Sequence, residues 1–236
     1  MIMKLQAIAF DIDGTLYPSA ALFVRMLPGA IRRLRLLLAF DKIRKQIRQP
    51  GFYAERRIPI PAGVDAFHRM QSALTAERLG RKPELVHGHI ESFFYGQQEE
   101  VFARIRLFPH VEACLESLRA AGYRLGALSD FPARRKLQLL KLDKYFDVIM
   151  TSEESGYVKP HRASFDQLAA QLGVPAGQTL YVGNSERYDV AGAQAAGMRT
   201  ALISRRRRVE SAADFVFRDY RQLTDFVARQ AAAPRA

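Results

Sequence analysis

Short apolar runs alternate with longer amphipathic segments over most of the chain. Runs such as 6–10 and 179–183 end abruptly at polar residues, which indicates buried strands that lead into loops. The same pattern predicts further strands at 123–128, 146–151, 199–203 and, more weakly, 214–217. Apolar positions at helical spacing predict helices over 110–121, 132–142, 161–172, 188–196 and 219–230. Strands that alternate with helices in this way are typical of βαβ units, so we expect an α/β fold with a parallel sheet.

A helical stretch separates the first strand from the rest of this pattern. The apolar stripe formed by Ile31, Leu34, Leu37 and Leu38 predicts a helix over 18–48. Helical periodicity continues over 63–80 and 83–105. The simplest architecture is therefore an α/β core made of residues 1–17 and 107–236, with a helical domain of residues 18–106 inserted after the first strand.

The composition narrows the class of protein. The chain has 236 residues, of which 48 % are hydrophobic and 25 % charged, and this excludes a disordered, collagenous or low-complexity protein. The single cysteine, Cys114, excludes an intramolecular disulfide and fits a reducing compartment. No apolar run is long enough to span a membrane, and the start of the chain lacks a signal-peptide cleavage pattern, so we expect a cytoplasmic location.

The net charge of +12 is concentrated in two places. Residues 25–57 hold ten Lys or Arg and two acids, a net charge of +8, and Arg205 to Arg208 add four more positive charges. A basic amphipathic helix can lie on an anionic membrane, steer an anionic substrate, or be an ordinary solvated face. Aromatic residues do not interleave with either basic region in a stacking pattern, which disfavours nucleic-acid binding. The oligomeric state stays open, because the apolar stripe could pack within the helical domain or against another subunit.

The pentapeptide Asp11-Ile12-Asp13-Gly14-Thr15 follows the first predicted strand directly. Two carboxylates so close together repel each other unless a proton or a cation relieves them. Mg²⁺ is the cation expected, because it prefers oxygen ligands and needs few of them from the protein. A turn or a helix cap is the alternative interpretation, since Asp, Gly and Thr all favour turns.

Polar residues also follow the other predicted strands. Ser129-Asp130 follows strand 123–128, Lys159-Pro160 precedes helix 161–172, and Gly183-Asn184-Ser185 with Asp189 follows strand 179–183. Each has a local explanation as a helix cap or a solvated side chain. Together, in order, at the carboxyl ends of strands in one sheet, they predict a ligand site.

These four motifs, DIDGT at 11–15, Ser129, Lys159-Pro160 and GNSERYD at 183–189, resemble those of the haloacid dehalogenase superfamily. The resemblance covers about residues 5–16 and 107–203. It implies a Rossmann-like core, a helical cap inserted after the first motif, and a Mg²⁺-dependent phosphatase that hydrolyses a small phosphorylated metabolite through an aspartyl-phosphate.

The resemblance also implies a role for each motif residue. Asp11 would be the nucleophile and Asp13 the general acid and then the general base. The residues expected to hold Mg²⁺ are Asp11, Asp13 through its backbone carbonyl, Asn184 and Asp189. Those expected to bind the phosphate or substrate are Gly14, Thr15, Ser129, Asp130 and Lys159. Asn184 departs from the family pattern, which has an acid there, so we expect weaker Mg²⁺ binding.

Two alternatives follow from the same residues. Asn184 and the basic region 25–57 favour a weakly active or inactive family member that acts as a binding protein at an anionic surface. A dehalogenase-type hydrolase is disfavoured by Asp13, because a halide leaving group needs no proton. The identity of the substrate is left open.

Overall fold

The computed structural model describes residues 4–20, 33–96, 102, 105–206 and 209–232. Its centre is a six-stranded sheet, in which every recorded strand pair is parallel and the strand order is β3-β2-β1-β4-β5-β6. The strands are β1 (Ala7–Phe10), β2 (Arg124–Ser129), β3 (Val148–Thr151), β4 (Thr179–Gly183), β5 (Arg199–Ile203) and β6 (Phe215–Phe217). The α/β fold with a parallel sheet is therefore confirmed.

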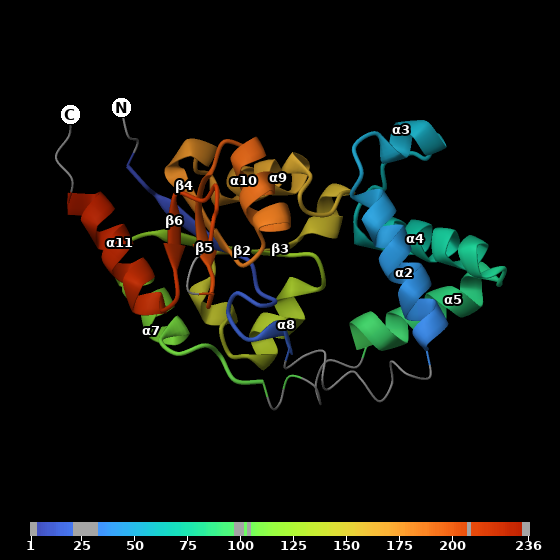
Figure 1. The fold of residues 1–236 in the computed structure, drawn as a ribbon, viewed down its shortest axis with the longest axis horizontal. Coiled ribbons are helices and arrows are strands. Elements are labelled where there is room, and N and C mark those ends of the chain that lie inside the picture. Colours follow the sequence, from blue (N-terminus) through green and yellow to red (C-terminus); the bar gives the residue numbers. More distant parts are fainter. Residues whose placement is uncertain (1–3, 21–32, 97–101, 103–104, 207–208, 233–236) are drawn as a thin grey trace.

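Helices cover both faces of this sheet (Figure 1). On one face, Ile8 and Phe10 of β1 pack with α7 (Val111–Ala120), α8 (Ala133–Leu139) and α11 (Tyr220–Ala232). On the other, Ala7 and Ala9 pack with α9 (Arg162–Leu172) and α10 (Ala191–Ala195). Side chains alternate between the two faces of a strand, so burial of all four β1 side chains fits a strand covered on both sides.

Short helical turns complete the core. They are η2 (Asp143–Tyr145), η3 (Ser152–Ser155), η4 (Ala176–Gln178) and the π-helix η5 (Glu186–Val190). The predicted helix 188–196 is thus divided into η5 and α10.

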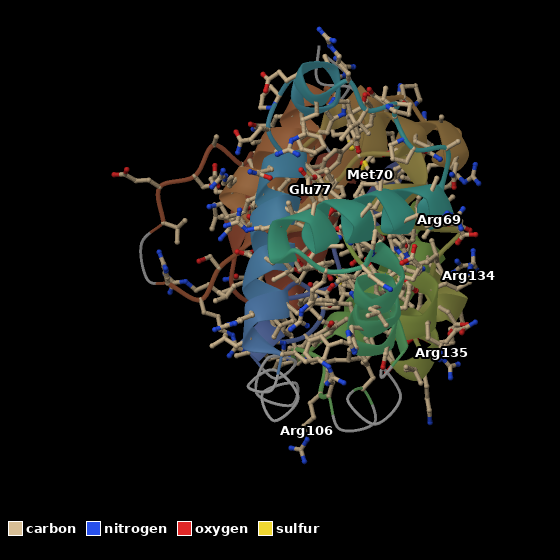
Figure 2. The ribbon with its side chains drawn as sticks, turned by 90° about the vertical axis from the view of Figure 1, so that its right-hand side faces the viewer. Arg69, Met70, Glu77, Arg106, Arg134 and Arg135 are labelled. Carbon is tan, nitrogen blue, oxygen red and sulfur yellow. The ribbon has the colours of Figure 1, made fainter. Side chains whose placement is uncertain are left out.

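A second group of helices packs beside the sheet and forms what we call the helical unit, residues 34–96 (Figure 1). It contains α2 (Leu34–Ile47), α3 (Phe52–Arg56), α4 (Val64–Leu79), α5 (Pro83–Ile90) and the π-helix η1 (Glu91–Gly96). The outer side of this unit faces the viewer in Figure 2, with Arg69, Met70 and Glu77 of α4 labelled. The expected domain boundaries at residues 18 and 106 stay a prediction.

The buried face of α2 differs from the stripe that the sequence suggested. Leu34 and Leu38 are 57 % and 61 % exposed, whereas Leu36, Phe40 and Ile43 are buried. Because Leu34 to Phe40 are apolar at all positions but one, the local pattern did not fix which side faces inward. Ile31 and most of the first half of the predicted helix 18–48 lie outside the described residues.

The two connections between the helical unit and the sheet lie next to each other. The Phe108 backbone N–H donates to the Leu16 carbonyl at 2.9 Å. The rings of Tyr17 and Phe102 meet edge to face, with their centroids 5.6 Å apart. The chain therefore leaves and rejoins the core at one place.

A buried carboxylate ties the helical unit to the core. Glu153 of η3 accepts from Arg44 Nη1 of α2 at 2.6 Å and lies 3.0 Å from His68 Nε2 of α4. Arg44 and Glu153 are both buried. Arg44 thus belongs to an internal ion pair, which removes one cation from the basic region that the sequence showed.

No helix in the described ranges is both long and apolar enough to cross a membrane.

This cluster predicts a pH-dependent stability. Burial opposes the charged imidazole, but Glu153 and Glu91 outweigh it and raise the pKa of His68 above its ordinary 6.5. Protonated His68 therefore stabilises the fold most at low pH, and this contribution is lost as pH rises through the raised folded-state pKa. We expect His68→Gln to cost about 1–3 kcal/mol near pH 6 and less near pH 9.

Urea unfolding of both proteins at the two pH values measures this difference. His89→Gln, at an exposed position of the same unit, is the matched control and should show little cost at either pH. An equal cost of His68→Gln at both pH values would contradict the assignment.

Candidate active site

Asp11 sits at the carboxyl end of the central strand. Its backbone N–H continues the β1–β4 pairing by donating to the Val182 carbonyl at 2.9 Å. The side chain is 6 % exposed. Its Oδ1 accepts from Lys159 Nζ at 2.7 Å and its Oδ2 from Thr15 Oγ1 at 2.8 Å. Both carboxylate oxygens are therefore held in fixed directions at the edge of the sheet where ligands bind.

Gly14 lets the loop after β1 approach the loop after β4. Its φ is +89°, and a Cβ there would lie 2.2 Å from Asn184 Nδ2. Asn184 is exposed, and its Oδ1 lies 3.5 Å from the same Thr15 hydroxyl that bonds to Asp11. Thr15 thus lies next to both Asp11 and Asn184. Two side chains whose oxygen atoms can bind a metal ion are therefore on the same side of the site.

Lys159 connects Asp11 to Asp189. Its Nζ donates to Asp11 Oδ1 and to Asp189 Oδ1, each at 2.7 Å. Asp189 is fixed in turn, because its Oδ2 accepts from the backbone N–H groups of Asn184 and Ser185 at 3.1 and 3.0 Å. A Cβ on Gly183 would lie 2.3 Å from the Cβ of Asp189, so only glycine fits there. In this structure the bonds of Asp189 run to Lys159 and to backbone amides.

The Asp13 carboxylate points to a different set of groups. It accepts from Ser129 Oγ at 3.0 Å, from the Tyr17 hydroxyl and from Lys136 Nζ. Lys136 lies on α8 and is 3 % exposed, whereas its neighbours Arg134 and Arg135 are exposed and project outward (Figure 2).

Sequence reasoning did not single out Lys136. A signal was present, because Ala133, Lys136 and Leu137 share the buried face of α8 and a lysine on such a face is unusual.

Asp130 lies beside the site but faces the helical unit. Its Oδ1 accepts from the Lys159 backbone N–H at 3.0 Å and from Ser152 Oγ at 2.6 Å. Its Oδ2 accepts at 2.7 Å from Nη2 of Arg48, the residue that follows α2. Sequence reasoning expected Asp130 to contact substrate, whereas its carboxylate bonds here are made within the protein. The structure brings the other expected residues together around Asp11.

The site is electrostatically unbalanced. Three carboxylates, those of Asp11, Asp13 and Asp189, meet two ammonium groups, those of Lys136 and Lys159. Burial is the main cause that raises the pKa of Asp11 to about 7; Lys159 opposes it, and Asp189 and Asp13 add to it. Burial also acts on Asp13, but the ammonium of Lys136 and hydrogen bonds from Lys136, Tyr17 and Ser129 outweigh it and lower the pKa of Asp13.

A divalent cation fits this charge distribution. The oxygen donors of Asp11 and Asn184 lie in a site with an excess of negative charge, which suits a hard cation. Within the described residues no group of three His, Cys, Asp or Glu side chains could hold a metal ion. Mg²⁺ does not require such a group, since it keeps several of its waters.

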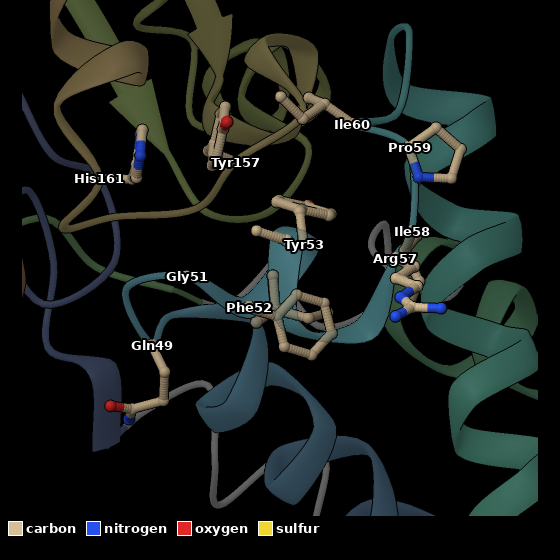
Figure 3. A pocket seen from close by; sticks show the side chains of 12 residues that line it. Gln49, Gly51, Phe52, Tyr53, Arg57, Ile58, Pro59, Ile60, Tyr157 and His161 are labelled. Atoms are coloured by element: carbon tan, nitrogen blue, oxygen red, sulfur yellow. The ribbon is translucent and has the colours of Figure 1, made fainter.

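A separate hollow of about 670 Å³ opens between the helical unit and the loop that carries Lys159 (Figure 3). Phe52, Tyr53, Ile60, Tyr157 and His161 are among its lining residues. None of the expected catalytic, phosphate-binding or metal-binding residues lines it.

Comparison with known proteins shows the family of this chain. A family model for haloacid dehalogenase-like hydrolases matches residues 5–197. The chain belongs to this family. It is therefore a hydrolase with the α/β core that its family shares.

Two relatives with established names are phosphatases. The chain is 30 % identical over 206 residues to the glyceraldehyde 3-phosphate phosphatase of Methanopyrus kandleri, covering 85 % of this chain and 84 % of the relative. It is 31 % identical over 196 residues to the phosphoglycolate phosphatase of Yersinia pestis, covering 82 % and 78 %.

Two solved structures show how widely the fold is used. A haloacid dehalogenase-type phosphatase from Thermococcus onnurineus aligns with a TM-score of 0.59 and 25 % identity, over 95 % of this chain and 98 % of that one. A 2-haloacid dehalogenase from Pseudomonas syringae aligns with a TM-score of 0.65 and 25 % identity, over 95 % and 99 %. The fold alone therefore does not separate the two reactions.

The Lys136–Asp13 pair can be tested through stability. Removing one member of a buried ion pair leaves the other without compensation, which typically costs 3–5 kcal/mol. Asp13 keeps some exposure, so we expect Lys136→Met to destabilise the metal-free protein by about 2–4 kcal/mol.

Urea unfolding in chelator measures the cost. Adding Asp13→Asn to Lys136→Met should recover part of the loss, because the unpaired charge is then absent. Arg134→Met, at an exposed position of the same helix, is the matched control. A double variant no more stable than Lys136→Met would show that the pair does not account for the cost.

Proposed function

We propose that this protein is a Mg²⁺-dependent phosphatase that hydrolyses a small phosphorylated metabolite through a covalent intermediate on Asp11. The observation that carries the proposal is the setting of Asp11: its carboxylate is held by Lys159 and Thr15 at the carboxyl end of β1, with Asp13 two residues further on. The phosphatase names of the two relatives support the substrate class, since both act on small phosphate monoesters by name.

In the first step an Asp11 oxygen attacks phosphorus. The new bond forms as the ester P–O bond breaks, and the leaving oxygen takes the electron pair of that bond and a proton from Asp13. In the second step water attacks the phosphorus of the aspartyl-phosphate and gives a proton to Asp13. The acyl phosphate bond then breaks, which releases inorganic phosphate and restores the Asp11 carboxylate.

The chain's own cations support these steps. Lys159 Nζ, 2.7 Å from Asp11 Oδ1, is placed to neutralise charge on the transferring phosphoryl group. Ser129 Oγ and Lys136 Nζ lie on the Asp13 side and can bind phosphate oxygens. When an anionic phosphate enters, it shares these donors with Asp13 and raises the pKa of that carboxyl, which favours the protonated form that the first step needs.

The residues that would hold Mg²⁺ are Asp11 through its carboxylate, Asp13 through its backbone carbonyl and Asn184 through its amide oxygen. When bound, the ion would neutralise charge between the anionic nucleophile and the anionic phosphate. Asp189 was also expected as a ligand; we propose that it contributes mainly by fixing Lys159, as its hydrogen bonds indicate.

Asp13 also favours phosphate hydrolysis over dehalogenation. Its carboxyl lies two residues beyond the proposed nucleophile and can give a proton to a leaving alcohol. A halide needs no such donor.

Phosphate release from an aryl phosphate, and from phosphoglycolate and glyceraldehyde 3-phosphate, tests the function. We expect turnover with Mg²⁺, none with chelator, and a loss of at least about 1,000-fold in Asp11→Asn, because a carboxamide does not form the covalent intermediate. Turnover that persists unchanged in Asp11→Asn would overturn the proposed mechanism.

Asn184→Asp tests the metal site. An added carboxylate beside Asp11 strengthens a site for a hard cation, so we expect the Mg²⁺ concentration for half-maximal activity to fall by about tenfold. Glu186→Gln, on the same loop and bonded to Ser211, is a control that should leave this concentration unchanged. An unchanged Mg²⁺ requirement in Asn184→Asp would place residue 184 outside the metal's ligand set.

A further inference from the structure

We propose that Arg48, which directly follows α2, is a positioning residue for this hydrolytic site: from the helical unit, it fixes the backbone of Lys159 and so the place of the Lys159 ammonium. The inference rests on the proposed function and adds a residue that neither the motifs nor the comparisons point to. Arg48 was visible in the sequence only as one of ten cations in the basic region.

Arg48 contacts three loops of the core at once. Its Nε donates to the Lys159 carbonyl at 2.9 Å, and its Nη2 donates to Asp130 Oδ2 at 2.7 Å. Its guanidinium lies over the ring of Tyr188, 4.7 Å from the ring centroid, in the turn that carries Asp189. One side chain from the helical unit therefore bridges the segments that follow β2, β3 and β4.

Arg48 and Asp130 together hold both backbone groups of Lys159. Arg48 donates to the Lys159 carbonyl, while the Lys159 N–H donates to Asp130 Oδ1 at 3.0 Å. Arg48 and Asp130 also form an ion pair with each other, and their side chains are each 13 % exposed. Burial acts against ionised Asp130, but Arg48, Lys159 and Arg44 outweigh it and hold the pKa of this carboxyl well below its usual range.

This arrangement matters because the lysine side chain is long. Lys159 Nζ must stay 2.7 Å from both Asp11 and Asp189, and its position depends on where the backbone starts. A misplacement of about 1 Å at a reacting centre costs on the order of 100-fold in rate. A planar guanidinium can make both bonds at fixed angles, whereas a lysine at position 48 has a single charged nitrogen.

Arg44 has a different place in the same junction. It donates to the Asp130 carbonyl at 2.7 Å, but its other bonds run to Glu153 and Gln71, away from Lys159. Of these two arginines, Arg48 is the one that hydrogen-bonds to the Lys159 backbone.

The test compares Arg48→Gln and Arg48→Lys with Arg56→Gln, an exposed arginine whose guanidinium lies over Phe52 in the same unit. For aryl phosphate hydrolysis we expect Arg48→Gln to lower kcat about 10–100-fold with KM within about threefold, since Lys159 acts mainly on the transition state. Arg48→Lys should show an intermediate loss. Arg56→Gln should match wild type.

A second readout does not depend on activity. Hydrogen exchange of the intact protein should be about tenfold faster in the peptide that contains the Lys159 amide for Arg48→Gln, and unchanged for Arg56→Gln. If Arg48→Gln does not fold, Arg48→Lys carries both measurements. A double-mutant cycle with Asp130→Asn should show strong coupling, because either change breaks the same pair.

The outcomes separate this inference from the proposed function. Normal kcat together with normal exchange at Lys159 in Arg48→Gln overturns the positioning role. A loss of kcat that merely follows a fall in thermal stability, with Lys159 exchange unchanged, also overturns it. If wild type shows no hydrolysis that depends on Asp11, the proposed function fails, and exchange at Lys159 still decides whether Arg48 fixes that loop.

Discussion

The site depends on one buried ammonium group. Lys159 lies between the carboxylates of Asp11 and Asp189, and all three side chains are nearly inaccessible to solvent. Charges buried this deeply are tolerated only when they are paired and hydrogen-bonded. The neighbouring residues therefore hold both carboxylates in place beside the lysine. Gly183 leaves room for Asp189, and two backbone amides bond to that carboxylate. Thr15 orients Asp11.

The same constraint links the two parts of the molecule. The backbone that carries Lys159 lies in the segment between β3 and α9, and its polar groups bond to Asp130 and to Arg48 of the helical unit. The Arg44–Glu153 pair adds a second tie nearby. Two cations of the basic region thus act inside the protein, while Arg35, Lys42 and Lys45 remain on the exposed face of α2.

The sequence was most informative where chemistry and topology coincide. Asp11 and the loop after β4 follow buried strands, and Ser129 is the last residue of one. Parallel strands bring their carboxyl ends to one edge, so the proximity of these residues followed from order alone. Lys136 and Arg48 could not be placed in this way, because their roles depend on which way a side chain on a helix, or just after its end, is turned. The shifted buried face of α2 illustrates the same limit.

Asp130 shows a finer limit. It adjoins Ser129, but β2 ends at Ser129 and Asp130 lies in the bend that follows. The Ser129 hydroxyl bonds to Asp13, whereas the Asp130 carboxylate bonds to Arg48. A sequence motif predicts the position of the backbone, but not which of two adjacent side chains points into the site.

The closeness of the two connections to the helical unit has a consequence for how such proteins diversify. The Phe108 N–H donates to the Leu16 carbonyl, so the two ends of the helical segment lie side by side. The whole segment is therefore attached to the core as one long loop. Long surface insertions of this kind add little to the entropic cost of closing the chain. Helical segments of other shapes could therefore be exchanged at this point over evolution, giving new selectivity to an unchanged set of reacting groups.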